Sequence, residues 1–541
     1  MKKLFNKARS SLQDLDPSLK FPSPSPQNSV FAQQTSTTST IAPPTPIDVL
    51  RYRYHHGANL GSIFVLERWL FGSMFPADSP GGSELDAVTT SVKTFGLKAT
   101  QDKWENHWRN AVTDADFEWL AREARCTSLR LPIGYFTLGE KFCRGTPFEG
   151  VAAVYLNAWS AVREVVARAR SWGIGILLDL HAVPGGANTD EHSGSTSGKA
   201  ELWGRRKNLD LAKQALVFIA HDVRAGLDGV VGIQVCNEAV WDAKGMYDWY
   251  DNVIDAIGEV DQSIPVYISD GWDLNRALSW CNGRKVFKRG PANPVVVDTH
   301  RYFTFDEKDR SQAPQEIISR VPGELGELQE KEGNVCDRGE AQVIIGEWSC
   351  VMDGRTWGRV RPEEKDNLVR EFGQIQGRRW QEKAGGHYFW TYKMEWMDGG
   401  EWGFVEQTKK NNISSPDYLK FSFDTVKSRA QASLSRRQEL GSNAKGSHQQ
   451  YWDQTSPGVR FQHELFNGAW EVGFSDAFSF FTLKSENGLG FKCTEGADKI
   501  GCLEIWVKKR LLESGQRGEF VWEWEQGFRR GVSDFYQCVG I

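Results

Sequence analysis

Val230-Val-Gly-Ile-Gln-Val-Cys-Asn-Glu238 is a short apolar run that ends in an amide and a carboxylate. Continuous apolar runs of this length are typical of strands that are buried on both faces of a parallel sheet. Val343-Ile-Ile-Gly-Glu347 has the same character and also ends in a glutamate. A carboxylate directly after a buried strand is costly unless it has partners or a chemical role. The two stretches therefore predict a parallel sheet with acidic groups at its strand ends.

Six further stretches complete a set of eight candidate strands, counting Val230–Cys236 and Val343–Gly346 as two. The six are Ala58–Val65, Ser128–Ile133, Ile174–Leu180, Pro265–Ser269, Val295–Thr299 and Tyr388–Thr391. Helical stretches such as Asn157–Trp172 and Asp210–Arg224 lie between them, each opening with a plausible capping residue. This alternation predicts the α/β class, and a closed (β/α)₈ TIM barrel explains eight units more economically than an open doubly wound sheet. No glycine-rich phosphate loop follows the first strand, which disfavours a dinucleotide fold.

The chain of 541 residues is longer than the roughly 200–250 residues of one ordinary barrel, so an appendage is expected. Residues 1–49, rich in Ser, Thr, Pro and Gln, are predicted to be a disordered tail because they bury too little surface. We assign the barrel to residues 50–430 and a small helical C-terminal extension to 431–541. Within that extension, Ala469-Trp-Glu-Val-Gly-Phe-Ser-Asp476 and Gly527-Phe-Arg-Arg-Gly-Val-Ser-Asp534 look like two copies of one helical unit.

Composition restricts the class of partner. The net charge of −5 with 25% charged residues provides no basic field for nucleic acid, so no nucleic-acid partner is expected. The sequence contains no run of about 20 apolar residues, so no transmembrane segment is expected. The N-terminus lacks the apolar core of a signal peptide, and nine scattered cysteines are typical of reduced thiols, so we expect a cytoplasmic protein. A small neutral substrate fits best, and the 22 tryptophans slightly favour carbohydrate.

Glu238 and Glu347 follow the fourth and seventh candidate strands. In a barrel, residues just past the carboxyl end of each strand face the active-site mouth. Two carboxylates that converge there meet the requirement of glycoside hydrolysis, in which one protonates the leaving oxygen and the other attacks the anomeric carbon. Taken singly, either glutamate could be a helix cap or an ion-pair partner. Their joint placement favours a catalytic pair, with retention at about 5–5.5 Å between the carboxyls and inversion at about 6.5–9.5 Å.

Two other strand ends carry polar residues at alternate positions, in Asp179-Leu-His181 and Asp298-Thr-His300-Arg-Tyr302. The period of two places these side chains on one strand face. A phenol beside a carboxylate can orient it, and imidazoles can bind sugar hydroxyls, although a structural role for each histidine stays open. A metal site built from these histidines and aspartates is conceivable. No His-x₃-His or cysteine cluster supports it, so neither a metal nor another cofactor is expected.

The strand ends as a set resemble glycoside hydrolase family 5 and, within it, the fungal exo-β-1,3-glucanase group. The resemblance runs from about residue 55 to about residue 405. It rests on Gly57-Ala-Asn-Leu-Gly61, Leu66-Glu-Arg-Trp69, Leu129-Arg-Leu-Pro-Ile-Gly-Tyr135, Leu178-Asp-Leu-His181, Asn237-Glu238, Val297-Asp-Thr-His-Arg-Tyr302, Gly346-Glu-Trp-Ser349 and Phe389-Trp-Thr-Tyr392.

The resemblance implies a role for each matched residue. Glu238 would be the acid/base and Glu347 the nucleophile, so Glu238 should have a raised pKa and Glu347 should receive hydrogen bonds. The residues that would orient Glu347 or bind the sugar are Glu67, Arg130, His181, Asn237, His300, Tyr302, Phe305 and Trp390. Phe305 matches one of two aromatics that clamp the next sugar in the group, whereas Asp190 stands at the other position. The acceptor side is therefore reworked.

The leading hypothesis is a retaining β-glycosidase, similar to glucan 1,3-β-glucosidases, that cleaves β-linked glucose from a glucan, oligosaccharide or glucoside. One alternative is a glycosidase that acts on a glucosylated lipid, sterol or small aglycone, because the acceptor loop is unusual. An alternative from another class is an inactive carbohydrate-binding or scaffold barrel. The presence of Glu238 and Glu347 together with their supporting residues argues against that last alternative.

Overall fold

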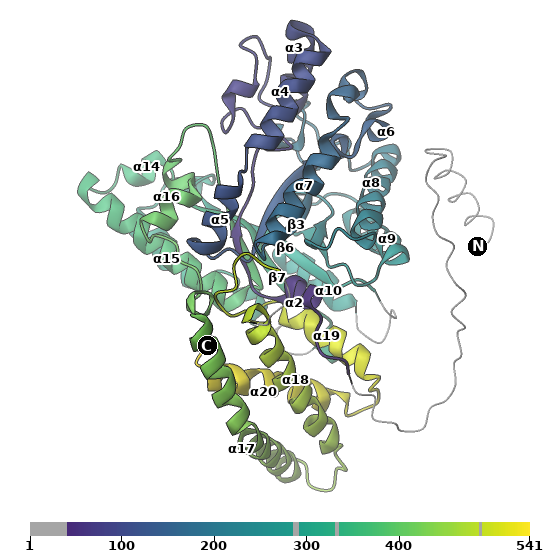
Figure 1. Ribbon diagram of the computed structural model, residues 1–541, viewed down its shortest axis with the longest axis vertical. Coiled ribbons are helices and arrows are strands. Elements are labelled where there is room, and N and C mark those ends of the chain that lie inside the picture. The colour runs from purple at the N-terminus through teal and green to yellow at the C-terminus, as the bar shows by residue number, and fades with distance from the viewer. Residues whose placement is uncertain (1–40, 285–291, 330–334, 486–489) are drawn as a thin grey trace, which may run out of the picture. The chain divides into compact units, whose positions relative to one another are not determined.

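The computed structural model describes residues 41–284, 292–329, 335–485 and 490–541 (Figure 1). The predicted tail over residues 1–49 lies mainly outside these residues. Helix α2 (Pro46–Tyr52) begins before residue 49, because Thr45 and Asp48 form a reciprocal capping box and Pro46 stands at the first helical position. The described chain is therefore helical before the predicted boundary.

Eight parallel strands form one sheet in the order β1-β8-β7-β6-β5-β4-β3-β2. The strands are β1 (His55–Ala58), β2 (Ser128–Gly134), β3 (Gly175–Ala182), β4 (Val230–Gln234), β5 (Val266–Ser269), β6 (Val295–Phe303), β7 (Gln342–Met352) and β8 (Gly386–Phe389). The ends of the sheet meet just past β1, where Asn59 and Arg130 form a parallel bridge and the Leu60 N–H donates to the Arg130 carbonyl at 2.8 Å. The predicted (β/α)₈ barrel is confirmed.

The first strand is the one whose predicted position was wrong. Ala58–Val65 was the expected span, but β1 ends at Ala58, and residues 61–65 form turns and bends. Ile63, Phe64 and Val65 are nevertheless buried in the main core. An apolar loop that packs into the core has the same composition as a buried strand, so hydrophobicity alone does not separate the two.

Helices cover the outside of the barrel (Figure 1). In α7 the buried residues Val162, Val165, Val166 and Ala169 follow the three- and four-residue spacing of one helical face. The barrel helices are α3 (Glu84–Phe95), α4 (Leu97–Asn110), α5 (Asp114–Arg122), α6 (Glu140–Cys143), α7 (Ala158–Ser171), α8 (Arg206–Arg224), α9 (Met246–Val260), α10 (Leu274–Gly283), α11 (Glu307–Arg310), α12 (Pro314–Arg320), α13 (Val335–Arg338), α14 (Gly354–Trp357), α15 (Lys365–Lys383) and α16 (Phe404–Lys409).

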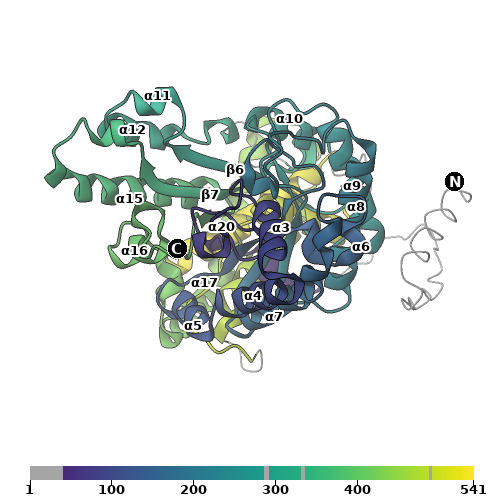
Figure 2. The same ribbon diagram turned by 90° about the horizontal axis from the view of Figure 1, so that it is seen from above.

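Three of these helices form a side layer next to β6 and β7. Figure 2 shows α11, α12 and α15 grouped on one side of the barrel. A separate apolar cluster joins α12 and α15 to the sheet, because Phe303 and Met352 at the strand ends pack against Ile317 of α12 and Phe372 of α15. The layer thus supports the two strands whose ends carry His300 and Glu347.

Four C-terminal helices complete the described chain: α17 (Phe423–Thr455), α18 (His463–Thr482), α19 (Leu503–Ser514) and α20 (Val521–Val539). The helical extension predicted from the sequence is confirmed, and α17 runs through the expected boundary at residues 430 and 431. In the described part of the chain, no helix combines the length and apolar composition of a bilayer-spanning segment.

The extension packs against the amino-terminal ends of the strands. The N–H of Tyr54, just before β1, donates to the Lys499 carbonyl at 2.9 Å, and the Glu504 N–H donates to Gln342 Oε1, at the start of β7, at 3.1 Å. These contacts lie at the end of the barrel opposite to the carboxyl ends of the strands, where the predicted site residues stand.

Candidate active site

Glu238, four residues past the end of β4, and Glu347, within β7, face each other at the mouth of the barrel. One oxygen of each carboxylate and one nitrogen of His300 all lie within 4.8 Å of one another. His300 Nδ1 is 2.8 Å from Glu238 Oε1 and 3.6 Å from Glu347 Oε2. The two carboxylates are therefore close enough to act on one anomeric carbon.

Local backbone irregularities aim both glutamates. The register between β6 and β7 shifts so that Thr299 pairs with Ile345 and His300 pairs with Glu347, which leaves Gly346 as an extra residue. Such a bulge re-aims the following side chain. A Cβ at Gly346 would lie only 2.0 Å from Asp298 Oδ1, so only glycine fits there. Glu238 has a φ of +42°, a strained conformation for a residue with a side chain.

Arg130 of β2 is the centre of the hydrogen-bond network and is fully buried. Its guanidinium binds five side chains at distances from 2.6 to 3.0 Å, namely Asn59, Asp179, Gln234, Asn237 and Glu347. Burial opposes the charge of Arg130, but Asp179 and Glu347 outweigh that effect and raise its pKa. A permanent buried cation thus fixes the nucleophile candidate Glu347 and the neighbouring amide of Asn237 in one frame.

Glu347 is held on both oxygens. Arg130 Nη1 donates to Oε1 at 2.9 Å, and Tyr302 Oη donates to Oε2 at 2.8 Å. Burial, together with the negative charge of Glu347, raises the pKa of Tyr302 well above its usual range, so the phenol remains a donor. The hydrogen bonds predicted for Glu347 are therefore present, and they orient its carboxylate across from Glu238.

Glu238 is also held on both oxygens, in its case by imidazoles. His300 Nδ1 lies 2.8 Å from Oε1, and His192 Nε2 lies 3.2 Å from Oε2. Burial favours a raised pKa, but the contacts with His192 and His300 outweigh it and hold the pKa of Glu238 well below its usual range. The raised pKa expected for Glu238 was therefore wrong for the free site, where the protons reside on the histidines.

The remaining predicted residues gather around this pair. His181 Nδ1 is 2.6 Å from Asp179, which leaves Nε2 toward the amide of Asn237 at 3.3 Å. The Trp390 ring lies 6.1 Å from the His181 imidazole and nearly parallel to it. Glu67 is buried and accepts from Trp69 Nε1 at 2.8 Å. Burial, the largest effect, raises the pKa of Glu67.

Phe305 is the predicted residue that lies furthest toward the surface. Its ring is exposed and stands 5.4 Å from the Tyr302 ring. Asp190, at the position where an aromatic was expected, is also exposed, and its Oδ2 lies 3.7 Å from His192 Nε2. The two positions at which the resemblance implied an aromatic pair therefore carry one aromatic and one carboxylate.

Three functional neighbours were missed from the sequence. Asn59 and Gln234 accept from Arg130, and His192 contacts Glu238. Gln234 is a polar residue within a buried strand, which is a usable signal of an inward-facing role. His192 lies in the three-residue 3-10 helix η4 (Glu191–Ser193) after β3, which is too short for a periodic pattern to show the direction of its side chain.

Two family models match the chain. Residues 85–392 match the family described as Cellulase (glycosyl hydrolase family 5). Residues 433–539 match the family described as Glucan 1,3-beta-glucosidase 3 C-terminal domain. The first match covers the barrel from α3 to β8, and the second covers most of the C-terminal helices.

Two fungal relatives span nearly the whole chain. An uncharacterized glycosyl hydrolase of Saccharomyces cerevisiae is 31% identical, and the alignment covers 93% of this chain and 96% of the relative. Glucan 1,3-beta-glucosidase 3 of Schizosaccharomyces pombe is 32% identical, with 89% and 94% covered. The crystal structure of rutinosidase from Aspergillus niger shares the fold, with a TM-score of 0.51 and 16% identity over 67% of this chain and 98% of that one. On its sequence and its barrel, the chain belongs to glycosyl hydrolase family 5 and is a β-glycosidase.

Proposed function

We propose that the enzyme cleaves β-1,3-linked glucose with retention, using Glu347 as nucleophile and Glu238 as acid/base. The observation that carries the proposal is the approach of the two carboxylates within 4.8 Å at His300. The linkage is supported by the relative named glucan 1,3-beta-glucosidase 3, which is 32% identical over most of the chain.

The reaction follows two displacements. An oxygen of Glu347 attacks the anomeric carbon, the bond from that carbon to the leaving oxygen breaks, and the leaving oxygen takes its electron pair and a proton from Glu238. Water then gives a proton to Glu238 and attacks the same carbon, and Glu347 leaves. Each attack inverts the configuration, so the product keeps the β configuration.

The proton for the first step comes from a shared group. His192 and His300 each contact Glu238, and His300 also lies 3.6 Å from Glu347, so a proton can pass between the imidazoles and Glu238. In the free site Glu238 is a carboxylate between two imidazoles. A substrate that brings its glycosidic oxygen to Glu238 excludes water from these side chains, and a proton moves from an imidazole to Glu238 for donation.

Side chains around the pair provide sugar recognition. Asn237 and His181 present an amide and an imidazole edge beside Glu347, and Glu67 offers a buried carboxylate oxygen. Trp390 offers an indole face, which suits the apolar face of a pyranose ring. These groups match a single glucose bound at the cleavage site.

The assignment of roles is tested with leaving groups of different quality. Glu347→Gln should lower kcat on every aryl β-glucoside on the order of 1,000-fold or more, because no nucleophile remains. Glu238→Gln should lower kcat/KM about 100-fold or more for a disaccharide, which needs a proton, and far less for dinitrophenyl glucoside, which does not. Proton NMR of the first-formed sugar reports retention.

Glu307→Gln is the matched control, since this exposed carboxylate pairs with Arg355 away from the site and should leave kcat unchanged. Wild-type turnover by Glu347→Gln would refute the nucleophile assignment. An equal loss on both substrates in Glu238→Gln would refute the acid/base assignment.

A second candidate function is cleavage of a glucoside with an apolar aglycone. Trp241 and Trp272 follow Glu238 and β5, and their side chains are 66% and 51% exposed. The Trp272 ring lies 6.3 Å from the His300 imidazole. Exposed indoles beside the predicted acid favour an apolar leaving group as much as a second sugar. If this candidate is right, Trp272→Ala should weaken kcat/KM for a steryl or octyl β-glucoside more than for laminaribiose.

A further inference from the structure

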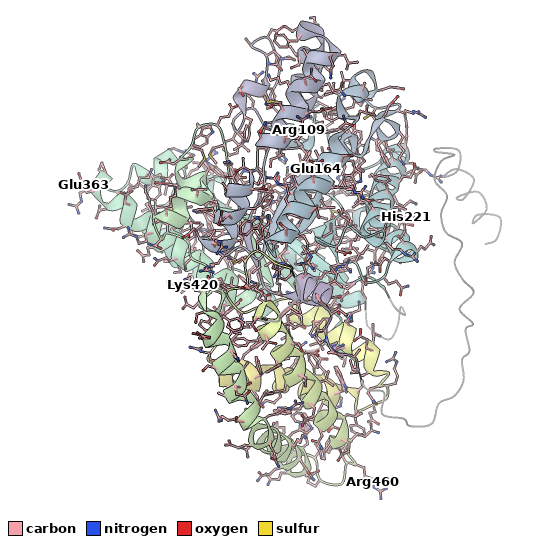
Figure 3. All side chains as sticks on the ribbon, viewed as in Figure 1. Arg109, Glu164, His221, Glu363, Lys420 and Arg460 are labelled. Atoms are coloured by element: carbon pink, nitrogen blue, oxygen red, sulfur yellow. The ribbon has the colours of Figure 1, made fainter. Side chains whose placement is uncertain are left out.

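Three side chains with metal-binding atoms meet in the C-terminal helical region, far from the glutamate pair. His448 lies in α17, His463 is the first residue of α18, and Glu523 lies in the first turn of α20. Figure 3 labels Arg460, in the segment between α17 and α18, at the end of this region that points away from the barrel. The three residues therefore join three helices at their outer end.

The geometry of the three atoms is compact. His448 Nε2 is 2.9 Å from Glu523 Oε2, and His463 Nδ1 is 3.0 Å from the same oxygen. All three atoms lie within 4.8 Å of one another. A tetrahedral zinc ion with bonds of about 2.0–2.1 Å separates its ligand atoms by roughly 3.4 Å. Small side-chain rotations suffice to bring the three atoms to those positions.

Outer partners hold the ligands in the required orientation. Asp453 Oδ1 lies 3.2 Å from His463 Nε2 and can accept a hydrogen bond from it. The other ring nitrogen, Nδ1, then faces the centre of the cluster without a proton. The Gln462 N–H donates to Glu523 Oε1 at 2.7 Å, which leaves Oε2 toward the centre. A carboxylate on the second nitrogen of a ligating histidine is the usual arrangement in zinc proteins.

The surroundings are apolar and mostly closed. Glu523 is fully buried, and the His463 side chain is 17% exposed, which leaves one open direction. The His448 ring stacks on the Phe466 ring, with 3.9 Å between the ring centroids. The rings of Trp452 and Trp522 lie 6.5 and 6.4 Å from the His448 ring.

We propose that His448, His463 and Glu523 bind one divalent transition metal of the zinc type, with water as the fourth ligand. Two imidazole nitrogens and one carboxylate oxygen are a preferred ligand set of zinc. The ion joins positions that are 15 and 60 residues apart in the chain. It therefore fastens α17, α18 and α20 at their outer end. This site does not depend on the proposed catalytic roles.

The test measures metal content and stability of the full-length protein. The chain, freed of any affinity tag, is incubated with excess zinc sulfate, desalted and analysed by plasma mass spectrometry. We expect about one zinc per chain in the wild type. His448→Gln and His463→Gln should retain less than about a tenth of that, because an amide can keep the hydrogen bond to Glu523 but is a poor zinc ligand. Chelation should lower the thermal midpoint of the wild type by several degrees and leave that of the variants in place.

His221→Gln, on α8 of the barrel, is the matched control and should bind zinc as the wild type does. Circular dichroism and turnover of an aryl β-glucoside verify that each variant is folded. If His448→Gln does not fold, the more exposed His463→Gln decides, together with cobalt substitution, since tetrahedral Co²⁺ gives intense visible bands. Absence of retained zinc in the wild type, or equal retention by the wild type and both histidine variants, would overturn the proposal.

Discussion

His192 decides where the acid proton resides in the free site. It contacts Glu238 Oε2 at 3.2 Å, while His300 contacts Oε1, so the carboxylate has a cationic partner on each side. Burial opposes protonation of His192, but Asp190 and Glu238 outweigh it and raise its pKa well above the usual range. One loop residue thus sets the charge state of the predicted acid/base.

Replacing His192 should shift the pH dependence of catalysis. In His192→Asn an amide can still donate to Glu238, but the positive charge is gone, so the pKa of Glu238 rises. With the positive charge of His192 gone, the proton that Glu238 shares with His300 is held to higher pH. The basic limb of kcat/KM against pH should therefore move upward by about one unit.

The same pH profile of His221→Asn, a histidine on the outer helix α8, should superimpose on that of the wild type. A basic limb that stays in place, or moves to lower pH, in His192→Asn would show that His192 does not control the proton on Glu238.

The contrast between predicted and missed residues has a physical cause. Glu238 and Glu347 follow apolar strands, so the barrel geometry assigns both to the same mouth before any coordinates are known. His181 and His300 follow from the alternation of side chains along a strand. His192 stands in the short 3-10 helix η4, which has no repeating sequence pattern, and its contact with Glu238 depends on the three-dimensional path of the segment after β3. The site residues that stand on strands can therefore be predicted from the sequence, whereas the charge state of Glu238, which depends on His192, cannot.

Helices α18 and α20 touch through glycines. A Cβ at Gly473 would lie 2.1 Å from the Phe528 carbonyl oxygen, and a Cβ at Gly531 would lie 2.2 Å from the Trp470 carbonyl oxygen. Trp470 also donates from Nε1 to Asp534 Oδ2 at 2.8 Å. The aromatic and glycine positions that repeat in the two sequence motifs are therefore contact positions of the α18–α20 pair, whereas the two aspartates differ: Asp534 binds Trp470 of α18, and Asp476 binds Trp506 and Arg510 of α19.

Gly473→Ala should destabilise the protein by about 2–3 kcal/mol, because the new methyl group must push two backbones apart. Gly468→Ala, in the same helix α18, is the matched control, since a Cβ there meets nothing within 4 Å. That change should stabilise the protein by roughly 0.5–1 kcal/mol through helix propensity. Urea unfolding of the two variants measures both. If Gly473→Ala proved as stable as Gly468→Ala, the close approach of the helices would be refuted.

The repeated motif was visible in the sequence because its three positions recur at equal spacing. The cluster of His448, His463 and Glu523 was not, since its members come from three helices and follow no metal-binding spacing. The expectation of no metal concerned the histidines and aspartates at the strand ends, where no metal-binding spacing is present. Sites assembled from distant helices become visible only when the helices are placed.

The helical extension and the barrel share a core. One continuous apolar cluster includes Leu177, Val231 and Ile344 of the strands together with Trp470 of α18 and Phe528 of α20. The extension covers the amino-terminal end of the barrel, whereas the glutamate pair stands at the other end. The cytoplasmic location expected from the sequence stays a prediction that microscopy of a tagged protein would check.

Asp498 connects the extension to the barrel through buried charge. Its carboxylate lies 3.2 Å from Arg53, just before β1, and 3.3 Å from Lys484. Burial favours a raised pKa, but Lys484 and Arg53 outweigh it and lower the pKa of Asp498. A carboxyl whose pKa is lowered on folding adds stability above its unfolded pKa of about 3.9 and loses it as the pH falls through the folded value.

Asp498→Asn should therefore destabilise the protein at neutral pH by about 3–5 kcal/mol, because two buried cations lose their counter-charge. Below the folded pKa of Asp498 the wild type carries a neutral carboxyl, so the difference between the two proteins should shrink toward acid. Since the core is shared, loss of aryl glucosidase activity and loss of helical circular dichroism should occur at one temperature in both. Asp417→Asn, which breaks the exposed pair with Lys420, should stay within about 1 kcal/mol of the wild type. A helical signal that melts in Asp498→Asn while glucosidase activity persists would show that the barrel stands without the extension.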